Sequence, residues 1–131
     1  MERWNMLNAA CPTRQVLDRI ADKWTMLVVV ALEPGTLRFS ELRRRVDGIS
    51  QKMLTQTLRG LEQDGFVDRD ALPTVPVTVR YTLTPLGHSL ADAVAGIRAW
   101  AYANMDAIEA ARADYQPGDG MPPTPMAAAG A

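Results

Sequence analysis

Apolar residues between Ser50 and Asp64 recur at helical spacing and leave a polar face of unusual composition. A rotation of about 100° per residue groups the apolar side chains on one side of a helix, namely Met53, Leu54, Leu58 and Leu61. The opposite side carries amides, a hydroxyl and two cations, namely Gln51, Lys52, Thr55, Gln56 and Arg59. Such groups hydrogen-bond to base edges and phosphates, whereas an ordinary exposed face is rich in Glu/Lys pairs. This face therefore favours contact with nucleic acid.

A shorter basic helix precedes this one. Its start is assigned to Ser40, whose hydroxyl suits an N-cap, and Asp47-Gly48 signals a turn after it. Ser50 is the second N-cap, and Gly65 suits the C-terminal stop. Residues 38–65 therefore predict a helix-turn-helix.

After Gly65 the period of the pattern changes from helix to strand. Residues 66–69 read as one strand, and the proline-punctuated stretch 72–76 reads as a loop. The second strand has an inward face of alternating residues, namely Val77, Val79, Tyr81 and Leu83. With a very short strand at Arg38–Phe39, residues 66–83 predict a small β-wing behind the helix-turn-helix.

Two further helices are expected upstream. Pro12 suits a first helical position, and an apolar stripe follows it at Val16, Leu17 and Ile20. Ala21-Asp22 is expected to interrupt the helical structure. The next helix, at 23–32, is apolar almost all round and is therefore expected to be buried. Pro34-Gly35 ends that helix. The chain is therefore predicted to be mainly α with a small β-wing.

A long helix at 84–113 follows the wing, with Thr84 as N-cap and Pro85 in the first turn. Its apolar stripe comprises Leu86, Leu90, Val94, Ile97, Ala101, Met105 and Ile108. A helix of this length spans roughly 45 Å, which favours a second chain as cover for part of the stripe. The alternative is packing against the N-terminal arm of the same chain, residues 1–11. Residues 116–131 are rich in Pro, Gly and Ala and are predicted to be disordered.

Composition narrows the class of protein. The 131 residues suit one domain, assigned to 1–115, and the single cysteine excludes an internal disulfide and argues against a zinc site. No signal peptide is visible, and the longest apolar run, 26–32, is too short to span a membrane, so a cytoplasmic location is expected. The net charge is −1, yet residues 38–59 carry six cations against two acids, a net of +4. That segment suits a polyanion, although a solvated basic surface is the alternative.

Several short motifs occur in an order that resembles the HxlR-type regulators, a MarR-related family. They are Cys11-Pro12, Asp22-Lys23-Trp24-Thr25, Arg38-Phe39-Ser40-Glu41-Leu42-Arg43, Gly48-Ile49-Ser50-Gln51-Lys52-Met53-Leu54-Thr55-Gln56 and Tyr81-Thr82-Leu83-Thr84-Pro85-Leu86-Gly87. The resemblance implies a homodimeric winged helix-turn-helix regulator, dimerised through the N-terminal arm and the long helix, that binds an inverted repeat in double-stranded DNA. The DNA-binding residues expected on this basis are Arg38, Ser40, Arg43, Arg44, Ser50, Gln51, Lys52, Thr55, Gln56, Arg59, Thr78 and Arg80.

Three positions depart from the family pattern. Ala21-Asp22 stands where Gly-Gly is common, which leaves open a continuous or kinked helix. Gly60 stands where a longer polar residue is usual and weakens the helix by up to about 1 kcal/mol relative to Ala, unless close backbone approach needs it. In the wing, Thr78 replaces a basic residue and Arg80 an acidic one, both on the outward face of the strand.

Cys11 is a candidate redox sensor. It precedes Pro12 at a helix N-terminus, where the helix dipole favours the thiolate, and Arg14 adds positive charge. Some members of the family sense oxidants or electrophiles through a cysteine in this context. The alternative is a buried, inert thiol.

The sequence therefore predicts a DNA-binding transcriptional regulator, assigned as a repressor, that responds to an oxidant or to a small molecule. Trp4 and Trp100 could line a ligand cavity, although core packing is the simpler interpretation. The alternative function is a winged-helix protein-interaction module. No enzyme is expected, since a Cys11–His88 dyad has no third orienting group, and no cofactor or metal is expected.

Overall fold

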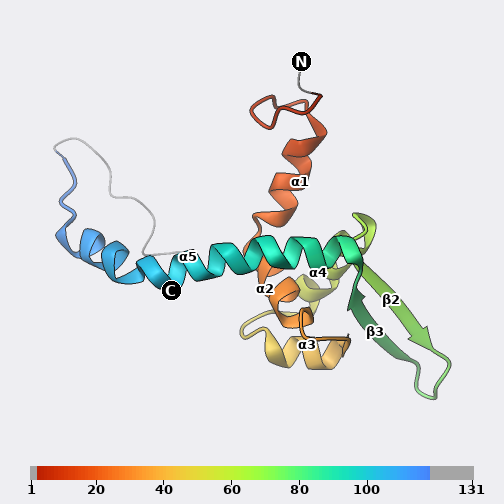
Figure 1. Cartoon of the computed structure of the whole chain (residues 1–131). Coiled ribbons are helices and arrows are strands. Elements are labelled where there is room, and N and C mark those ends of the chain that lie inside the picture. The colour runs from red at the N-terminus through yellow and green to blue at the C-terminus, as the bar shows by residue number, and fades with distance from the viewer. Residues whose placement is uncertain (1–2, 119–131) are drawn as a thin grey trace. The chain divides into compact units, whose positions relative to one another are not determined.

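The computed structural model describes residues 3–118 (Figure 1). Its elements are α1 (Pro12–Ile20), α2 (Lys23–Leu32), β1 (Leu37–Arg38), α3 (Phe39–Arg45), α4 (Gln51–Gln63), β2 (Val67–Leu72), β3 (Thr78–Leu83) and α5 (Pro85–Asp114). This arrangement confirms a mainly helical winged helix-turn-helix with a small antiparallel sheet. The chain up to Ile97 forms one compact unit, and the chain from Arg98 forms a second. Within the described range, no helix is both long and apolar enough to cross a membrane.

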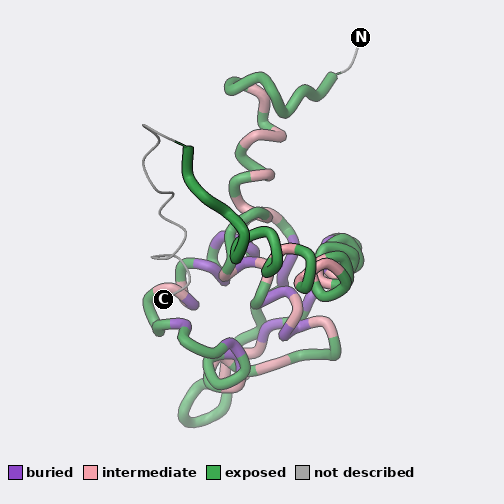
Figure 2. The backbone as a smooth tube through the Cα atoms, turned by 90° about the vertical axis from the view of Figure 1, so that its left-hand side faces the viewer, coloured by how far each residue is buried: buried purple, intermediate pink, exposed green. Residues whose placement is uncertain are grey.

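The core of the first unit lies between α2, the apolar side of α4, the sheet and the start of α5. Its most completely buried side chains are Leu32, Leu42, Leu54, Leu58, Leu61, Val28, Val29 and Val67. Figure 2 shows the buried residues gathered together within the first unit, whereas the N-terminal arm is exposed. The predicted apolar side of α4 is thus the side that packs inward, which turns its polar side outward.

The helix boundaries follow the predicted caps, with one correction. The Ser50 hydroxyl accepts a hydrogen bond from the Met53 amide at 3.0 Å, and Gly65 ends α4 with a φ of 83°. The prediction that Ser40 caps α3 is wrong. The N-cap is Arg38, two residues earlier, and the Glu41 carboxylate satisfies the first turn by accepting a hydrogen bond from the Arg38 amide at 2.9 Å.

The break between the first two helices is also decided by a cap. Asp22 is the N-cap of α2, and its carboxylate accepts a hydrogen bond from the Thr25 amide at 3.1 Å. Because an N-cap residue has extended rather than helical dihedral angles, α1 and α2 are separate helices and not one continuous helix. The predicted interruption at Ala21-Asp22 is confirmed.

The sheet has the strand order β1-β3-β2, with both pairings antiparallel. Residue Arg69 lies opposite Tyr81, and Asp70 lies opposite Arg80. The β2 strand runs to Leu72, three residues beyond the predicted end. Val77 lies outside β3 and its side chain is 65% exposed, so its predicted inward position is wrong. Side chains alternate between the inward and outward faces only within β3, where pairing with β2 begins.

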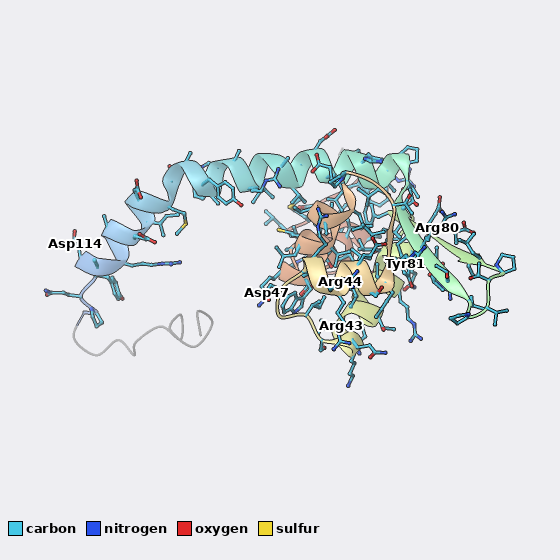
Figure 3. All side chains as sticks on the ribbon, turned by 90° about the horizontal axis from the view of Figure 1, so that it is seen from below. Arg43, Arg44, Asp47, Arg80, Tyr81 and Asp114 are labelled. Carbon is cyan, nitrogen blue, oxygen red and sulfur yellow. The ribbon has the colours of Figure 1, made fainter. Side chains whose placement is uncertain are left out.

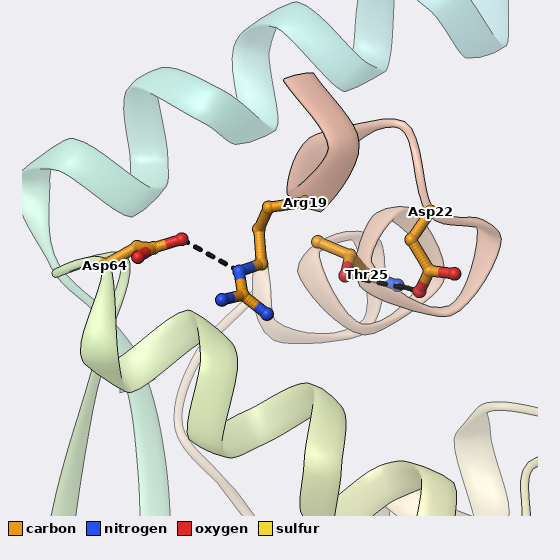
Figure 4. A network of polar contacts seen from close by, with 4 residues as sticks. All are labelled: Arg19, Asp22, Thr25 and Asp64. Carbon is orange, nitrogen blue, oxygen red and sulfur yellow. Dashed lines mark hydrogen bonds and ion pairs between the residues drawn. The ribbon is translucent and has the colours of Figure 1, made fainter. Parts of the chain in front are cut away.

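Helix α1 is held by little apolar packing. Within the described chain none of its residues is fully buried. Instead, the Arg19 Nε donates a hydrogen bond to Asp64 Oδ2 at 2.8 Å, and this ion pair ties α1 to the C-terminal end of α4 (Figure 4). The Arg19 guanidinium lies where a Cβ on Gly60 would be. Close approach of a side chain therefore explains the glycine in the middle of α4.

Helix α5 begins as predicted and leaves much of its stripe uncovered. The Thr84 hydroxyl accepts a hydrogen bond from the Gly87 amide at 3.0 Å, which is the expected N-cap. Leu90 and Val94 are buried, whereas Ile97 is 52% exposed. In the described part of the second unit, the exposed large apolar and aromatic side chains are Trp100, Tyr102 and Tyr115. The predicted disordered tail at 116–131 lies outside the described residues from 119 onward.

Candidate nucleic-acid interface

Helix α3 and the first turn of α4 together form a basic cleft. Its lining residues are Phe39, Ser40, Arg43, Arg44 and Gln51, and its volume is about 540 Å³. Four of these five residues belong to the DNA-binding set expected from the sequence. The Ser50 cap fixes the start of α4, which holds Gln51 beside the arginines of α3. The helix-turn-helix thus brings the Gln51 amide next to the guanidinium groups of Arg43 and Arg44.

The outward side of α4 carries the remaining helical members of the set. Gln51, Lys52, Gln56 and Arg59 are exposed, as predicted. The Thr55 hydroxyl donates a hydrogen bond to the Gln51 carbonyl at 2.9 Å, so only its lone pairs are free to accept from a ligand. Exposed amides and guanidinium groups on a helix supported by buried leucines have the geometry needed to enter a DNA groove.

Gln56 lies at the edge of this side. It lines a different cleft, of about 440 Å³, which also includes Arg19 and Asp22 near α1. Gln56 therefore lies beside the α1 side of α4, whereas Gln51 lies beside the α3 arginines. The four exposed residues of α4 therefore form a strip rather than a single point of contact.

The electrostatics of this surface favour an anionic partner. Among the described residues, ion pairs join Arg19 to Asp64 and Arg80 to Asp70. The cations of the helix-turn-helix surface have no acidic partner within that range, namely Arg43, Arg44, Lys52 and Arg59. Exposed guanidinium and ammonium groups without an acidic partner can bind phosphates without first breaking an internal ion pair.

The sheet members of the set lie elsewhere. Arg38 and Arg80 are paired across β1 and β3, on the face opposite to the one that carries Tyr81. The Arg80 guanidinium is bound to Asp70 at 3.2 Å, and the Thr78 hydroxyl receives a hydrogen bond from Thr74 at 3.0 Å. Figure 3 shows Arg80 on the hairpin, apart from Arg43 and Arg44 on α3. The structure does not bring these sheet residues together with the polar side of α4.

One cation missed at the sequence level lies on the α4 side of the sheet. Arg69 lines a cleft of about 350 Å³ together with Thr55, Arg59 and Tyr81. Its strand position has the same parity as the buried Val67, so both residues face α4. The period-2 pattern could have identified this face, but β2 was expected to end at Arg69, which hid the alternation.

Cys11 is the N-cap residue of α1 and is partly exposed. Its sulfur lies 3.0 Å from the Thr13 hydroxyl and accepts a hydrogen bond from the Asn5 amide at 3.2 Å. The Thr13 hydroxyl first, and then the Asn5 amide, lower the pKa of the Cys11 thiol below its ordinary value. Hydrogen bonds, rather than the charge of Arg14 expected from the sequence, thus favour the thiolate.

Comparison with known proteins places this arrangement in a family. The model of the HxlR-like helix-turn-helix family matches residues 19–109. The uncharacterized HTH-type transcriptional regulator YtfH of Escherichia coli K12 is 45% identical over 112 residues, which cover 86% of this chain and 89% of the relative.

Solved structures agree with that assignment. The putative transcriptional regulator ytfH from Salmonella typhimurium superimposes with a TM-score of 0.79 at 45% identity, over 84% of this chain and 98% of its own. The redox regulator HypR in its reduced form has a TM-score of 0.70 at 38% identity, over 76% of this chain and 98% of its own. The chain therefore belongs to the HxlR-like helix-turn-helix family of transcriptional regulators.

Proposed function

We propose that this protein is a sequence-specific DNA-binding repressor that acts in the cytoplasm as a homodimer on an inverted-repeat operator. The observation that carries the proposal is the basic cleft between α3 and α4, where Gln51 lies beside Arg43 and Arg44, whose guanidinium groups form no ion pair within residues 3–118. An amide reads adenine edges and guanidinium groups bind phosphates, so one surface supplies both sequence preference and affinity.

The residues of this surface divide by role. Gln51 and Lys52 lie in the first turn of α4, the part of a recognition helix that reaches deepest into the major groove. Ser40, Arg43 and Arg44 lie on α3, which would cross the sugar-phosphate backbone. The other proposed contacts are Ser50, Thr55, Gln56 and Arg59 around these two groups, and Arg38, Thr78 and Arg80 on the sheet, which lie apart from the polar side of α4.

Dimerisation is supported by apolar side chains that the described chain leaves uncovered. In the first unit, Trp4 is 49% exposed, Leu7 is 87% exposed and Ile97 is 52% exposed. In the second unit, Trp100 is 60% exposed. Large exposed apolar residues on the arm and on α5 favour association with a second copy through these segments. A two-fold dimer would present two recognition helices to half-sites about one helical turn apart, or roughly 34 Å.

Repression would then be steric, because a dimer bound over a promoter excludes polymerase. A signal would act by changing the spacing of the two recognition helices. The thiol of Cys11 is the proposed receiver of an oxidant or electrophile, since hydrogen bonds already lower its pKa. HypR, a relative of known structure, is described as a redox regulator. The product would be an intersubunit disulfide, a mixed disulfide or a thiol adduct.

Gel-shift titration against the DNA upstream of the protein's own gene tests DNA binding. Gln51→Ala should reduce discrimination between specific and random duplexes by about 1–3 kcal/mol. Arg44→Ala should weaken binding to both duplexes alike and lower the salt slope by about 1. Arg112→Ala is the control, since it removes an exposed cation near the end of α5. Equal affinity for specific and random DNA in the native protein would favour the protein-interaction alternative.

The signal is tested by adding the thiol oxidant diamide to the operator complex. For a disulfide, two Cys11 thiols from two protomers would lose two protons and two electrons to diamide. Release of the native protein, retention of Cys11→Ser and recovery with dithiothreitol are expected. In-vitro transcription from the same promoter shows whether binding represses. Identical binding by the native protein and Cys11→Ser, with and without diamide, would remove Cys11 from the mechanism.

A further inference from the structure

The cleft that Arg69 lines lies beside the proposed recognition helix, between α4 and the two longer strands. Its lining residues are Thr55, Leu58, Arg59, Glu62, Arg69 and Tyr81, and its volume is about 350 Å³. Helix α4 supplies one wall and the β2–β3 pair supplies the other. The cleft thus joins the outward side of α4 to the base of the wing, two elements that a winged helix-turn-helix presents to the same duplex.

The position of Arg69 in this cleft is set by the core. Val67, two residues earlier on the same strand, is 2% exposed, and Tyr81, directly opposite Arg69, is 8% exposed. Alternation along the strand therefore turns Arg69 toward α4, while Asp70 and Arg80 pair on the other face. Arg69 itself is exposed, as is Arg59 on the opposite wall.

Two guanidinium groups share this cleft without an ion pair. Glu62 also lines it, yet in the described part of the chain neither Arg59 nor Arg69 lies within ion-pair distance of an acid. Two cations and one acid give a local charge of +1 on an open surface. Such an arrangement favours an anion between the two cations, because the attraction of each cation to the anion offsets the repulsion between the cations. Planar guanidinium groups match a phosphate through paired hydrogen bonds.

We propose that Arg59 and Arg69 together hold one backbone phosphate of the bound DNA. The inference rests on the proposed function and refines it in two ways. It adds Arg69 to the DNA-binding residues, and it gives Arg59 a backbone phosphate, rather than a base edge, as its partner. The paired wing residue Arg80 lies outside this contact, because its guanidinium is bound to Asp70 on the opposite face of the sheet.

The first test compares variants by gel shift over a range of salt concentrations. Arg69→Ala should weaken binding to operator and random duplexes alike, by about ten-fold. It should also lower the salt slope by about 0.9 for each phosphate that the variant no longer neutralises. Arg69→Lys should retain the slope while recovering only part of the affinity, since an ammonium keeps the charge but not the paired hydrogen bonds. Arg112→Ala, which removes an exposed cation near the end of α5, is the control and should leave affinity and slope unchanged.

The second test locates the phosphate on the DNA. Single phosphates in each half-site are replaced in turn by neutral methylphosphonates. One replacement should weaken the native protein at least as much as Arg69→Ala does. The same replacement should cost less in the Arg69→Ala variant, which keeps Arg59, and nothing in a variant that carries both Arg59→Ala and Arg69→Ala. The unfolding temperature of each variant, measured by circular dichroism, shows that the fold is retained.

Distinct results would overturn the proposal. Unchanged binding by Arg69→Ala, or a loss confined to the operator sequence, would exclude a phosphate contact while leaving the repressor function intact. Failure of the native protein to prefer any operator would remove both the proposed function and this refinement of it.

Discussion

Gly60→Ala is a substitution whose effect depends on a residue in another helix. Alanine is favoured over glycine in the interior of a helix by about 1 kcal/mol, so a change in the middle of α4 should stabilise the protein if nothing opposed it. The structure places the Arg19 guanidinium where the new Cβ would stand. The substitution must therefore displace Arg19 from its place over α4.

The magnitude follows from what Arg19 loses. Its Nε lies 2.8 Å from Asp64 Oδ2, and the two side chains are 33% and 30% exposed. A partly exposed ion pair of this kind contributes at most about 1 kcal/mol to the free energy of unfolding. The gain in helix propensity and the loss of the pair therefore nearly cancel in the native background. In an Arg19→Ala background only the gain remains, so Gly60→Ala should stabilise by about 1 kcal/mol there.

A double-mutant cycle measures this coupling. Urea unfolding followed by circular dichroism, at one fixed protomer concentration, should give an interaction energy between positions 19 and 60 of about 1 kcal/mol. Gly96→Ala is the matched control, because a Cβ at that exposed helical position meets nothing within 4 Å. It should stabilise equally in both backgrounds. If Gly60→Ala also stabilised equally in both, the contact between Arg19 and Gly60 would be refuted.

Three other outcomes are expected. Ser50→Ala should lower the free energy of unfolding by about 1 kcal/mol through loss of the α4 cap; an unchanged urea midpoint would contradict this. Gly87→Ala should lower it by about 1–3 kcal/mol, since the added Cβ would overlap the Phe66 carbonyl oxygen, and a stabilised variant would show that the contact relaxes freely. The pH midpoint for alkylation of Cys11 by iodoacetamide should lie lower in the folded protein than in urea, because the thiolate reacts and its pKa is lowered. Thr13→Ala should move that midpoint up, and no movement would mean that the hydroxyl is not the main cause.

Local signals in the sequence were enough to predict most elements of the fold. The caps Ser50 and Thr84 and the stop Gly65 act within three residues of their own position, so the local sequence is enough to identify them. The failure at Ser40 was local as well. Both a hydroxyl at Ser40 and a carboxylate at Glu41 could satisfy the start of α3, and the structure uses the carboxylate.

The polar side of α4 was likewise determined by the sequence, because helical periodicity decides which residues face away from the buried leucines. Tertiary structure alone decided which cations are free to bind an anion. Arg80 is paired with Asp70 and Arg69 faces α4, and both facts depend on a strand register that links residues ten or more positions apart. The role of Gly60 depends in the same way on Arg19, which is 41 positions away along the chain and reaches α4 only after folding. Short-range preferences therefore decide the elements, whereas pairing between distant charges depends on how those elements pack.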